Sequence, residues 1–167
     1  MSNVHSAQAA ASGLELFRHA LAALAYRGGK AVRSAPPDFA EFRPSAASRS
    51  AAEILSHIGD LMDWALSILK EATNWKSSRP LAWEEEVRRF HSSIGALDKY
   101  LASGQAAPPS LQKLLQGPIA DALSHVGQLT MLRRLSGSPV KGENYFIADI
   151  EIGRVGPDQP VPRREFD

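Results

Sequence analysis

The chain has 167 residues, of which 44% are apolar and 22% charged, and its formal net charge is +1. These values are typical of a globular protein, so we expect a single domain with a sizeable core. The near-neutral charge gives no support to a nucleic-acid or anionic-membrane surface, and the absence of cysteine excludes disulfides, thiolate nucleophiles and cysteine-ligated zinc.

The beginning of the chain lacks the charged segment and the apolar run of a signal peptide. No stretch reaches the roughly 18 consecutive apolar residues that indicate a transmembrane helix. A chain without cysteine is also compatible with a reducing compartment. We therefore expect a cytoplasmic protein with neither a nucleic-acid nor a membrane partner.

The first predicted helix begins after a short polar segment. Residues 1–11 are small and polar, and we expect them to be flexible. Ser12 and Glu15 have the spacing of a capping box, in which the two side chains satisfy free N–H groups at a helix start. The helix should end near Arg27 or one turn later, because two consecutive glycines come next and each lowers helix stability by about 1 kcal/mol relative to alanine.

The second predicted helix runs from Ser50 to about Thr73. A loop over 35–49, which contains three prolines, precedes it. Ser50 and Glu53 form another capping box. The helix has an apolar stripe at helical spacing, which consists of Ile54, Ile58, Leu61, Ala65, Ile68 and Leu69.

Two further helices complete the predicted core. Helix three covers 81–103, and a loop over 105–109 comes after it. Helix four starts at Gly117-Pro118, since proline is tolerated at the first helical position, and it ends near Ser136. The segment 138–167 has no helical period, and we expect an extended strap over the other helices or over a partner subunit.

These elements predict an all-α fold. Four amphipathic helices without a convincing strand pattern are typical of a helix bundle. We expect an up-down-down-up-type four-helix bundle over residues 12–137, with an extended C-terminal tail over 138–167 and the flexible N-terminus over 1–11.

Polar residues interrupt the apolar stripe of helix four. At about 100° per residue, Asp121, His125 and Gln128 lie among the apolar residues of the stripe, which are Ala122, Leu129, Leu132 and Leu135. Polar groups on a core-facing stripe must be hydrogen-bonded, paired or metal-bound. Asp121 and His125 are four residues apart, so their Cβ atoms lie about 5–6 Å from each other on one helix face.

His57 lies at the edge of the buried face of helix two and supplies a third candidate ligand. Together, His57, Asp121 and His125 would suit one divalent metal such as zinc, nickel, iron(II) or manganese, with open positions left for water. A metal-free ion pair between Asp121 and His125 is the alternative. Gln128 is a candidate neighbour of the site, and Asp60 is either a hydrogen-bond partner of His57 or a solvated surface residue.

Two segments resemble motifs of the DinB superfamily, the DinB/YfiT-like four-helix bundles. Residues 54–60, Ile-Leu-Ser-His-Ile-Gly-Asp, with Trp64 shortly after them, resemble the second-helix motif of that family. Residues 121–129, Asp-Ala-Leu-Ser-His-Val-Gly-Gln-Leu, are similar to its H-x-x-x-H-x-G-Q-L motif. Leu132-Arg133-Arg134-Leu135, one residue before Gly137, is similar to the family's residues just after that motif. The resemblance covers roughly residues 12–140.

This resemblance implies a bundle with one divalent metal, usually held by three histidines. His57 matches the first ligand position and His125 the third, whereas Asp121 stands where the family has histidine. Characterised relatives are thiol-dependent S-transferases, isomerases and hydrolase-like enzymes, and they are often dimeric. The expectation is therefore a metal-dependent hydrolase or a thiol-dependent transferase or isomerase with an unknown small-molecule substrate. The alternative is a non-catalytic bundle dimer with a relict or structural metal site.

Overall fold

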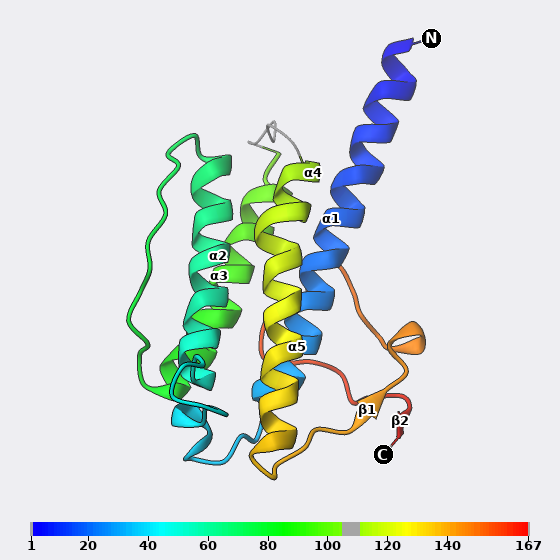
Figure 1. Cartoon of the computed structure of the whole chain (residues 1–167). Helices are drawn as coiled ribbons and strands as arrows, with labels where there is room; N and C mark the ends of the chain where they lie inside the picture. Colours follow the sequence, from blue (N-terminus) through cyan, green and yellow to red (C-terminus); the bar gives the residue numbers. More distant parts are fainter. Residues whose placement is uncertain (1, 105–110, 167) are drawn as a thin grey trace.

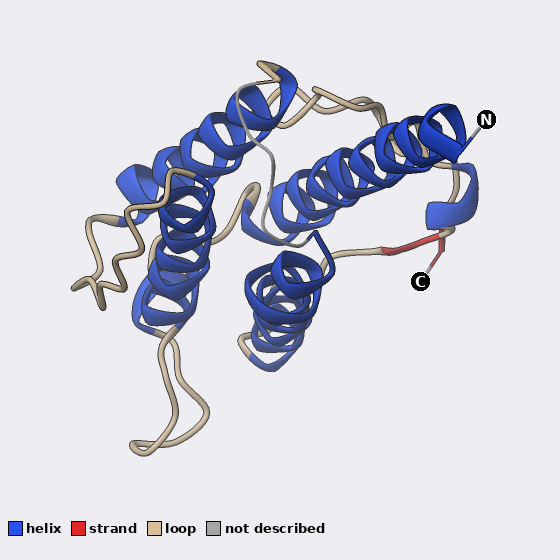
Figure 2. Cartoon of the chain, turned by 90° about the horizontal axis from the view of Figure 1, so that it is seen from above, coloured by secondary structure: helices blue, strands red, loops and turns tan. Residues whose placement is uncertain are grey.

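Four long helices form most of the protein, whose computed structural model describes residues 2–104 and 111–166, with side chains from residue 12 onward. They are α1 (Ser2–Val32), α2 (Ala51–Leu69), α3 (Trp83–Ala102) and α5 (Ala120–Leu135) (Figure 1). Helix α2 packs against α3 and α5, and α1 packs against the same two helices (Figure 2). The chain is thus mainly helical, as the hydrophobic periodicity predicts.

Helix α1 is longer than predicted at both ends. It begins at Ser2, so the predicted start at Ser12 is wrong, and it continues through the two glycines to Val32. A Cβ atom added to Gly28 would lie 2.3 Å from Cζ of the buried Phe90 ring. The glycine therefore lets α1 approach α3 closely, and this packing outweighs its low helix propensity. The prediction of a flexible segment over 1–11 falls on residues whose side chains lie outside the described set.

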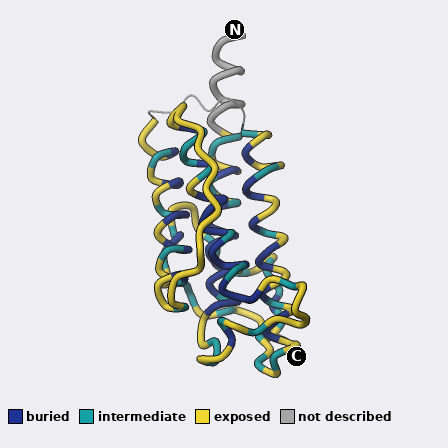
Figure 3. The backbone as a smooth tube through the Cα atoms, turned by 60° about the vertical axis from the view of Figure 1, so that its left-hand side comes forward, coloured by how far each residue is buried: buried dark blue, intermediate teal, exposed yellow. Residues whose placement is uncertain are grey.

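Helix α2 begins at the predicted capping box. The backbone N–H of Ser50 donates to Oε2 of Glu53 at 2.6 Å, and the backbone N–H of Glu53 donates to Oγ of Ser50 at 3.3 Å. The helix ends at Leu69, one turn earlier than predicted. An exposed connection over residues 70–82 then runs back along α2 to the start of α3 (Figures 1 and 3).

The last long helix is entered earlier than predicted. The short helix α4 (Leu111–Leu114) leads into a π-helical turn, η2 (Leu115–Ile119), which leads directly into α5. Pro118 lies inside this turn, so its predicted position at the start of the helix is wrong. Because proline has no N–H and disturbs the regular hydrogen-bond ladder, a local widening of the helix accommodates it. The predicted loop over 105–109 lies outside the described residues.

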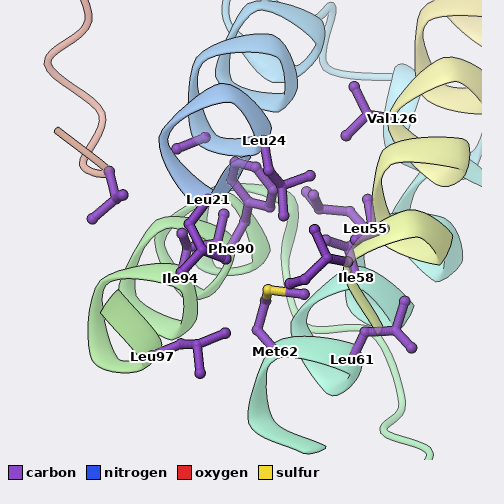
Figure 4. Packing of buried hydrophobic residues seen from close by; sticks show 14 of the residues in the cluster. Leu21, Leu24, Leu55, Ile58, Leu61, Met62, Phe90, Ile94, Leu97 and Val126 are labelled. Carbon is purple, nitrogen blue, oxygen red and sulfur yellow. The ribbon is translucent and has the colours of Figure 1, made fainter. Parts of the chain in front are cut away.

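Apolar side chains from all four long helices meet in one core (Figure 4). The labelled core residues are Leu21, Leu24, Leu55, Ile58, Leu61, Met62, Phe90, Ile94, Leu97 and Val126. Burial of each such side chain contributes roughly 1.5–3 kcal/mol before the loss of conformational entropy is counted. Within the described part of the chain, none of the helices combines the length and the apolar character needed to span a bilayer.

Arg133 joins the ends of α1 and α5. It lies in the last turn of α5 and is only 5% exposed. Its guanidinium donates to the carbonyl oxygens of Ala31 and Arg33, both at 3.1 Å, and to that of Ser34 at 3.3 Å. Its Nε also donates to the carbonyl oxygen of Ser138 at 2.8 Å. The last carbonyls of a helix have no partner within the helix, so Arg133 acts as the C-terminal cap of α1.

The C-terminal segment forms a small strand pair and contacts α1. Strand β1 (Gly142–Glu143) pairs antiparallel with β2 (Glu165–Phe166), and the short helix η3 (Tyr145–Ile147) comes after β1. The buried carboxylate of Glu143 accepts hydrogen bonds from the Tyr26 hydroxyl at 2.6 Å and from Lys30 Nζ at 2.8 Å. Burial and this carboxylate together raise the pKa of Tyr26. The sequence pattern did not predict this strand pair.

A buried histidine also contacts the C-terminal segment. His91 of α3 is 8% exposed, and its Nδ1 lies 3.2 Å from the carbonyl oxygen of Val155. Burial lowers the pKa of His91, although the bond to Val155 opposes the shift. Below the ordinary histidine pKa of about 6.5, the unfolded chain therefore binds more protons at this site than the folded chain does.

We expect the free energy of unfolding to decrease as the pH falls from about 6.5 toward the lower pKa of the folded state. Urea denaturation at pH 7.5 and pH 5.5 measures this decrease. It should be smaller in His91→Gln, because glutamine does not titrate, and should persist in the control His19→Gln, whose side chain is exposed. An equal decrease in the wild type and His91→Gln would contradict the prediction. His57, whose pKa is also lowered, contributes with the same sign.

Candidate metal site

The three predicted ligands lie together between α2 and α5. His57 comes from α2, and Asp121 and His125 come from adjacent turns of α5. Nε2 of His57 lies 3.4 Å from Oδ2 of Asp121, and Nε2 of His125 lies 3.5 Å from Oδ1 of the same carboxylate. One ligand atom from each residue lies within 4.8 Å of the others, so the cluster could hold a metal ion.

The site is deepest at the histidines and opens at the carboxylate. The side chains of His125 and His57 are 10% and 18% exposed, whereas that of Asp121 is 47% exposed. The sequence places Asp121 and Leu135 within the buried stripe, but Leu135 is 56% exposed. The buried residues of α5 are Ala122, His125, Val126, Leu129, Leu132 and Arg133, so the stripe is narrower than predicted. A solvent-reachable carboxylate above two shielded imidazoles leaves an approach to the cluster.

Gln128 fixes the orientation of one histidine. Its Oε1 lies 3.0 Å from Nδ1 of His125. An amide oxygen only accepts, so with an N–H at Nδ1 of His125 this contact leaves Nε2 to face the cluster. Such a partner on the far nitrogen is usual for metal-binding histidines. The contact agrees with the prediction that Gln128 neighbours the site.

Aromatic rings hold the other histidine. The His57 ring lies edge to face with that of His125, with centroids 4.7 Å apart, and with that of Trp75 at 5.8 Å. Trp75 in turn packs against Trp64 at 5.6 Å. Burial is the main cause that lowers the pKa of His57; the charges of His125 and Arg49 lower it further, and Asp121 opposes them. The neutral form, which is the form that binds metals, is therefore favoured.

Asp60 is neither a partner of His57 nor a solvated residue. It is 4% exposed and accepts hydrogen bonds from Nη2 of Arg89 at 2.6 Å and from the backbone N–H of Ser78 at 2.8 Å. Burial would raise the pKa of Asp60, but these donors hold it below its ordinary value. Asp60 thus ties α2 to α3 and to the 70–82 connection. The sequence offers no spacing signal for this contact, because Arg89 lies on another helix.

A mostly apolar pocket of about 390 Å³ borders the cluster. Its lining includes His125 and Gln128, and Ile54 of α2 and Leu132 of α5 contribute apolar walls. Arg49, from the loop before α2, also lines it.

No known protein family, curated protein or solved structure matches this chain.

Proposed function

We propose that this chain binds one divalent metal ion through His57, Asp121 and His125 and uses it in catalysis. The observation that supports this most directly is the convergence of three donor groups from two helices, with donor separations of 3.4 and 3.5 Å. Ligand atoms placed about 2.0–2.2 Å from a tetrahedral ion are themselves separated by about 3.3–3.6 Å. The two separations, which involve different oxygens of Asp121, fall in this range, so the donor set could hold a divalent ion and would leave at least one coordination position for another ligand.

The same contacts are longer than those of a close ion pair. A charge-assisted hydrogen bond between a histidine and a carboxylate is typically about 2.7–2.9 Å long. Both contacts of Asp121 are longer than this, and each of them involves a different oxygen of the carboxylate. Such long contacts leave the three groups available to an ion shared among them.

We further propose that the chain is a DinB/YfiT-like protein with the up-down-down-up order of helices. The order of the two motifs supports this, as does the long 70–82 connection, which allows consecutive helices to run in the same direction. Asp121 in place of a third histidine adds one negative charge to the site. A carboxylate broadens the metal preference toward manganese and iron(II) beside zinc and nickel.

The proposed reaction class is hydrolysis or thiol-dependent transfer or isomerisation. A divalent metal supplies Lewis acidity, which lowers the pKa of a bound water or thiol. The residues of this chain contribute orientation: Gln128 holds the His125 ring, and Trp75 packs on that of His57. The adjoining apolar pocket would hold the substrate beside the metal.

A non-catalytic dimer with a relict or structural metal site is the second candidate. The departure at Asp121 favours it, and so do two exposed apolar residues on α5, Met131 at 51% and Leu135 at 56% exposed. Turnover of a substrate panel that chelation abolishes and added metal restores would exclude this candidate. Metal-loaded protein that dimerises and turns over no substrate would support it.

Metal content tests the site itself. Elemental analysis of the untagged wild-type chain should find about one divalent ion per chain, because three ligands converge on one point. His57→Ala should lose the ion, since two ligands from one helix bind weakly, and His19→Ala should keep it because His19 is exposed and outside the cluster. An equal metal content in the wild type and His57→Ala would refute the proposal.

A further inference from the structure

The two histidines of the candidate site are held in different ways. Nδ1 of His125 lies 3.0 Å from the amide oxygen of Gln128. Nδ1 of His57 makes no hydrogen bond with any residue that the structure describes, and its Nε2 contacts Asp121 at 3.4 Å. A metal-binding histidine usually has a hydrogen-bond partner on its second nitrogen, which fixes the orientation of the ring. Since His57 has none among these residues, another contact must orient its ring.

A tryptophan from the 70–82 connection makes this contact. The ring of Trp75 lies edge to face with that of His57, with centroids 5.8 Å apart, and with that of Trp64, with centroids 5.6 Å apart. His57 and Trp64 are seven residues apart on α2, which places them on one face about two turns from each other. Trp75 therefore packs across the interval between them. Trp75 is still 47% exposed, so this packing needs support from the rest of the connection.

Two backbone tethers bracket Trp75. The residue just before it, Asn74, donates its backbone N–H to Oγ of Ser67 on α2 at 3.1 Å. Three residues after it, Ser78 donates its backbone N–H to Oδ2 of Asp60 on α2 at 2.8 Å. The connection is exposed along its whole length and runs beside α2 without forming a strand or a helix (Figures 1 and 3). These two contacts therefore hold the backbone on either side of the tryptophan against the helix.

Asp60 is a firmly held acceptor for the second tether. It is 4% exposed, and its other carboxylate oxygen accepts a hydrogen bond from Nη2 of Arg89 at 2.6 Å. Arg89 passes over Gly59, where an added Cβ atom would lie only 3.0 Å from Cζ of the guanidinium. The glycine thus leaves the guanidinium its place against α2, from which it also contacts Asp63 at 2.8 Å. A buried carboxylate with both oxygens engaged fixes Ser78 more firmly than an exposed one would.

We infer that the 70–82 connection is a positioning element of the site, in which the Asp60–Arg89 pair anchors the chain so that Trp75 fixes the ring of His57. The orientation of this ring is a property of the metal-free chain, whereas its consequence for metal affinity rests on the proposed function. Trp75 is a positioning residue, because it acts through His57. By linkage, an ion bound to His57 in turn stabilises the anchored connection.

Nuclear magnetic resonance of the metal-free, full-length chain tests the orientation. The rings of His57 and His125, whose centroids are 4.7 Å apart, should give a nuclear Overhauser contact in the wild type. Trp75→Ala should weaken this contact. Ser78→Pro should weaken it too, because proline lacks the N–H that binds the buried carboxylate and no side chain at the histidines is changed. Ser77→Pro is the control, since the Ser77 N–H has no hydrogen bond within the described residues.

Competition with a chelator measures the consequence for zinc binding. Trp75→Ala and Ser78→Pro should each raise the dissociation constant for zinc about fivefold, because the ring contact that orients His57 is lost. Trp75→Phe keeps an aromatic ring and should stay within about twofold of the wild type. Ser77→Pro should bind zinc as the wild type does. Zinc should also slow hydrogen exchange of the 70–82 connection in the wild type, but not in Trp75→Ala.

The two measurements separate a failure of the positioning role from a failure of the proposed function. If the wild-type chain binds no zinc, the proposed function fails, and the contact between the two rings alone decides the positioning role. A ring contact as strong in Trp75→Ala or in Ser78→Pro as in the wild type would overturn the inference. Wild-type zinc affinity in either variant of a chain that does bind zinc would overturn it as well.

Discussion

A divalent metal at about a thousand times its dissociation constant should raise the free energy of unfolding of the wild-type chain by about 4 kcal/mol. For a domain of this size, that corresponds to a rise in melting temperature of roughly 8–16 °C. The reason is linkage: the ion binds the folded chain, in which α2 and α5 bring three ligands together, and not the unfolded chain. Differential scanning calorimetry with zinc or manganese against chelated protein measures the shift.

Variants of the three proposed ligands distinguish binding at this site from a general effect of metal ions on stability. His57→Ala and His125→Ala should abolish the shift, and His19→Ala should show it in full. Asp121→His restores the three-histidine set of the resembled family and should keep the shift, because histidine at this position of the helix reaches the same point. Equal shifts in the wild type and His57→Ala would show that the ion binds elsewhere.

Removal of the guanidinium of Arg133 should have the largest effect on the stability of the metal-free chain. Arg133→Met keeps much of the apolar stem but leaves the carbonyl oxygens of Ala31, Arg33 and Ser34 without this donor. Of these carbonyls only that of Ala31 belongs to a buried residue, so loss of the charged donor should cost about 1.5–3 kcal/mol, which corresponds to a decrease in melting temperature of roughly 3–12 °C. Urea denaturation and calorimetry measure the two quantities.

The neighbouring arginine provides a matched control. Arg134 lies in the same helical turn but is exposed, so Arg134→Met should change the free energy of unfolding by less than about 0.5 kcal/mol. Arg133→Lys should be nearly as damaging as Arg133→Met, because an ammonium cannot reproduce the fork that contacts three carbonyls at once. Comparable stability of Arg133→Met and Arg134→Met would show that the cap contributes little.

Local sequence signals predicted most of the helices. The capping box at Ser50 and Glu53 placed the start of α2, since both reciprocal hydrogen bonds depend only on residues three apart. The similar pattern at Ser12 failed, because a capping box indicates a helix start only where no helix precedes it. Pro118 was misplaced for a related reason: a π-helical turn can carry proline, and no local spacing announces one.

Long-range contacts account for the features that the sequence could not predict. Gly28 needs Phe90 to explain why the helix does not stop there, and Arg133 needs the carbonyls at the end of α1. The candidate site was more accessible to prediction, because Asp121 and His125 are fixed by helical spacing and His57 by an inward position on a second helix. Arg49 and the apolar walls of the adjoining pocket come from separate elements, and sequence spacing does not report that they meet.

The exposed 70–82 connection divides the proposed ligands between two parts of the chain. All of its residues are exposed, so it is a natural target for limited proteolysis. A single cut there would leave one fragment with His57 and another with Asp121 and His125. If the two halves remain folded, the ion would join the fragments across the break, in addition to the core that α1 and α2 share with α3 and α5.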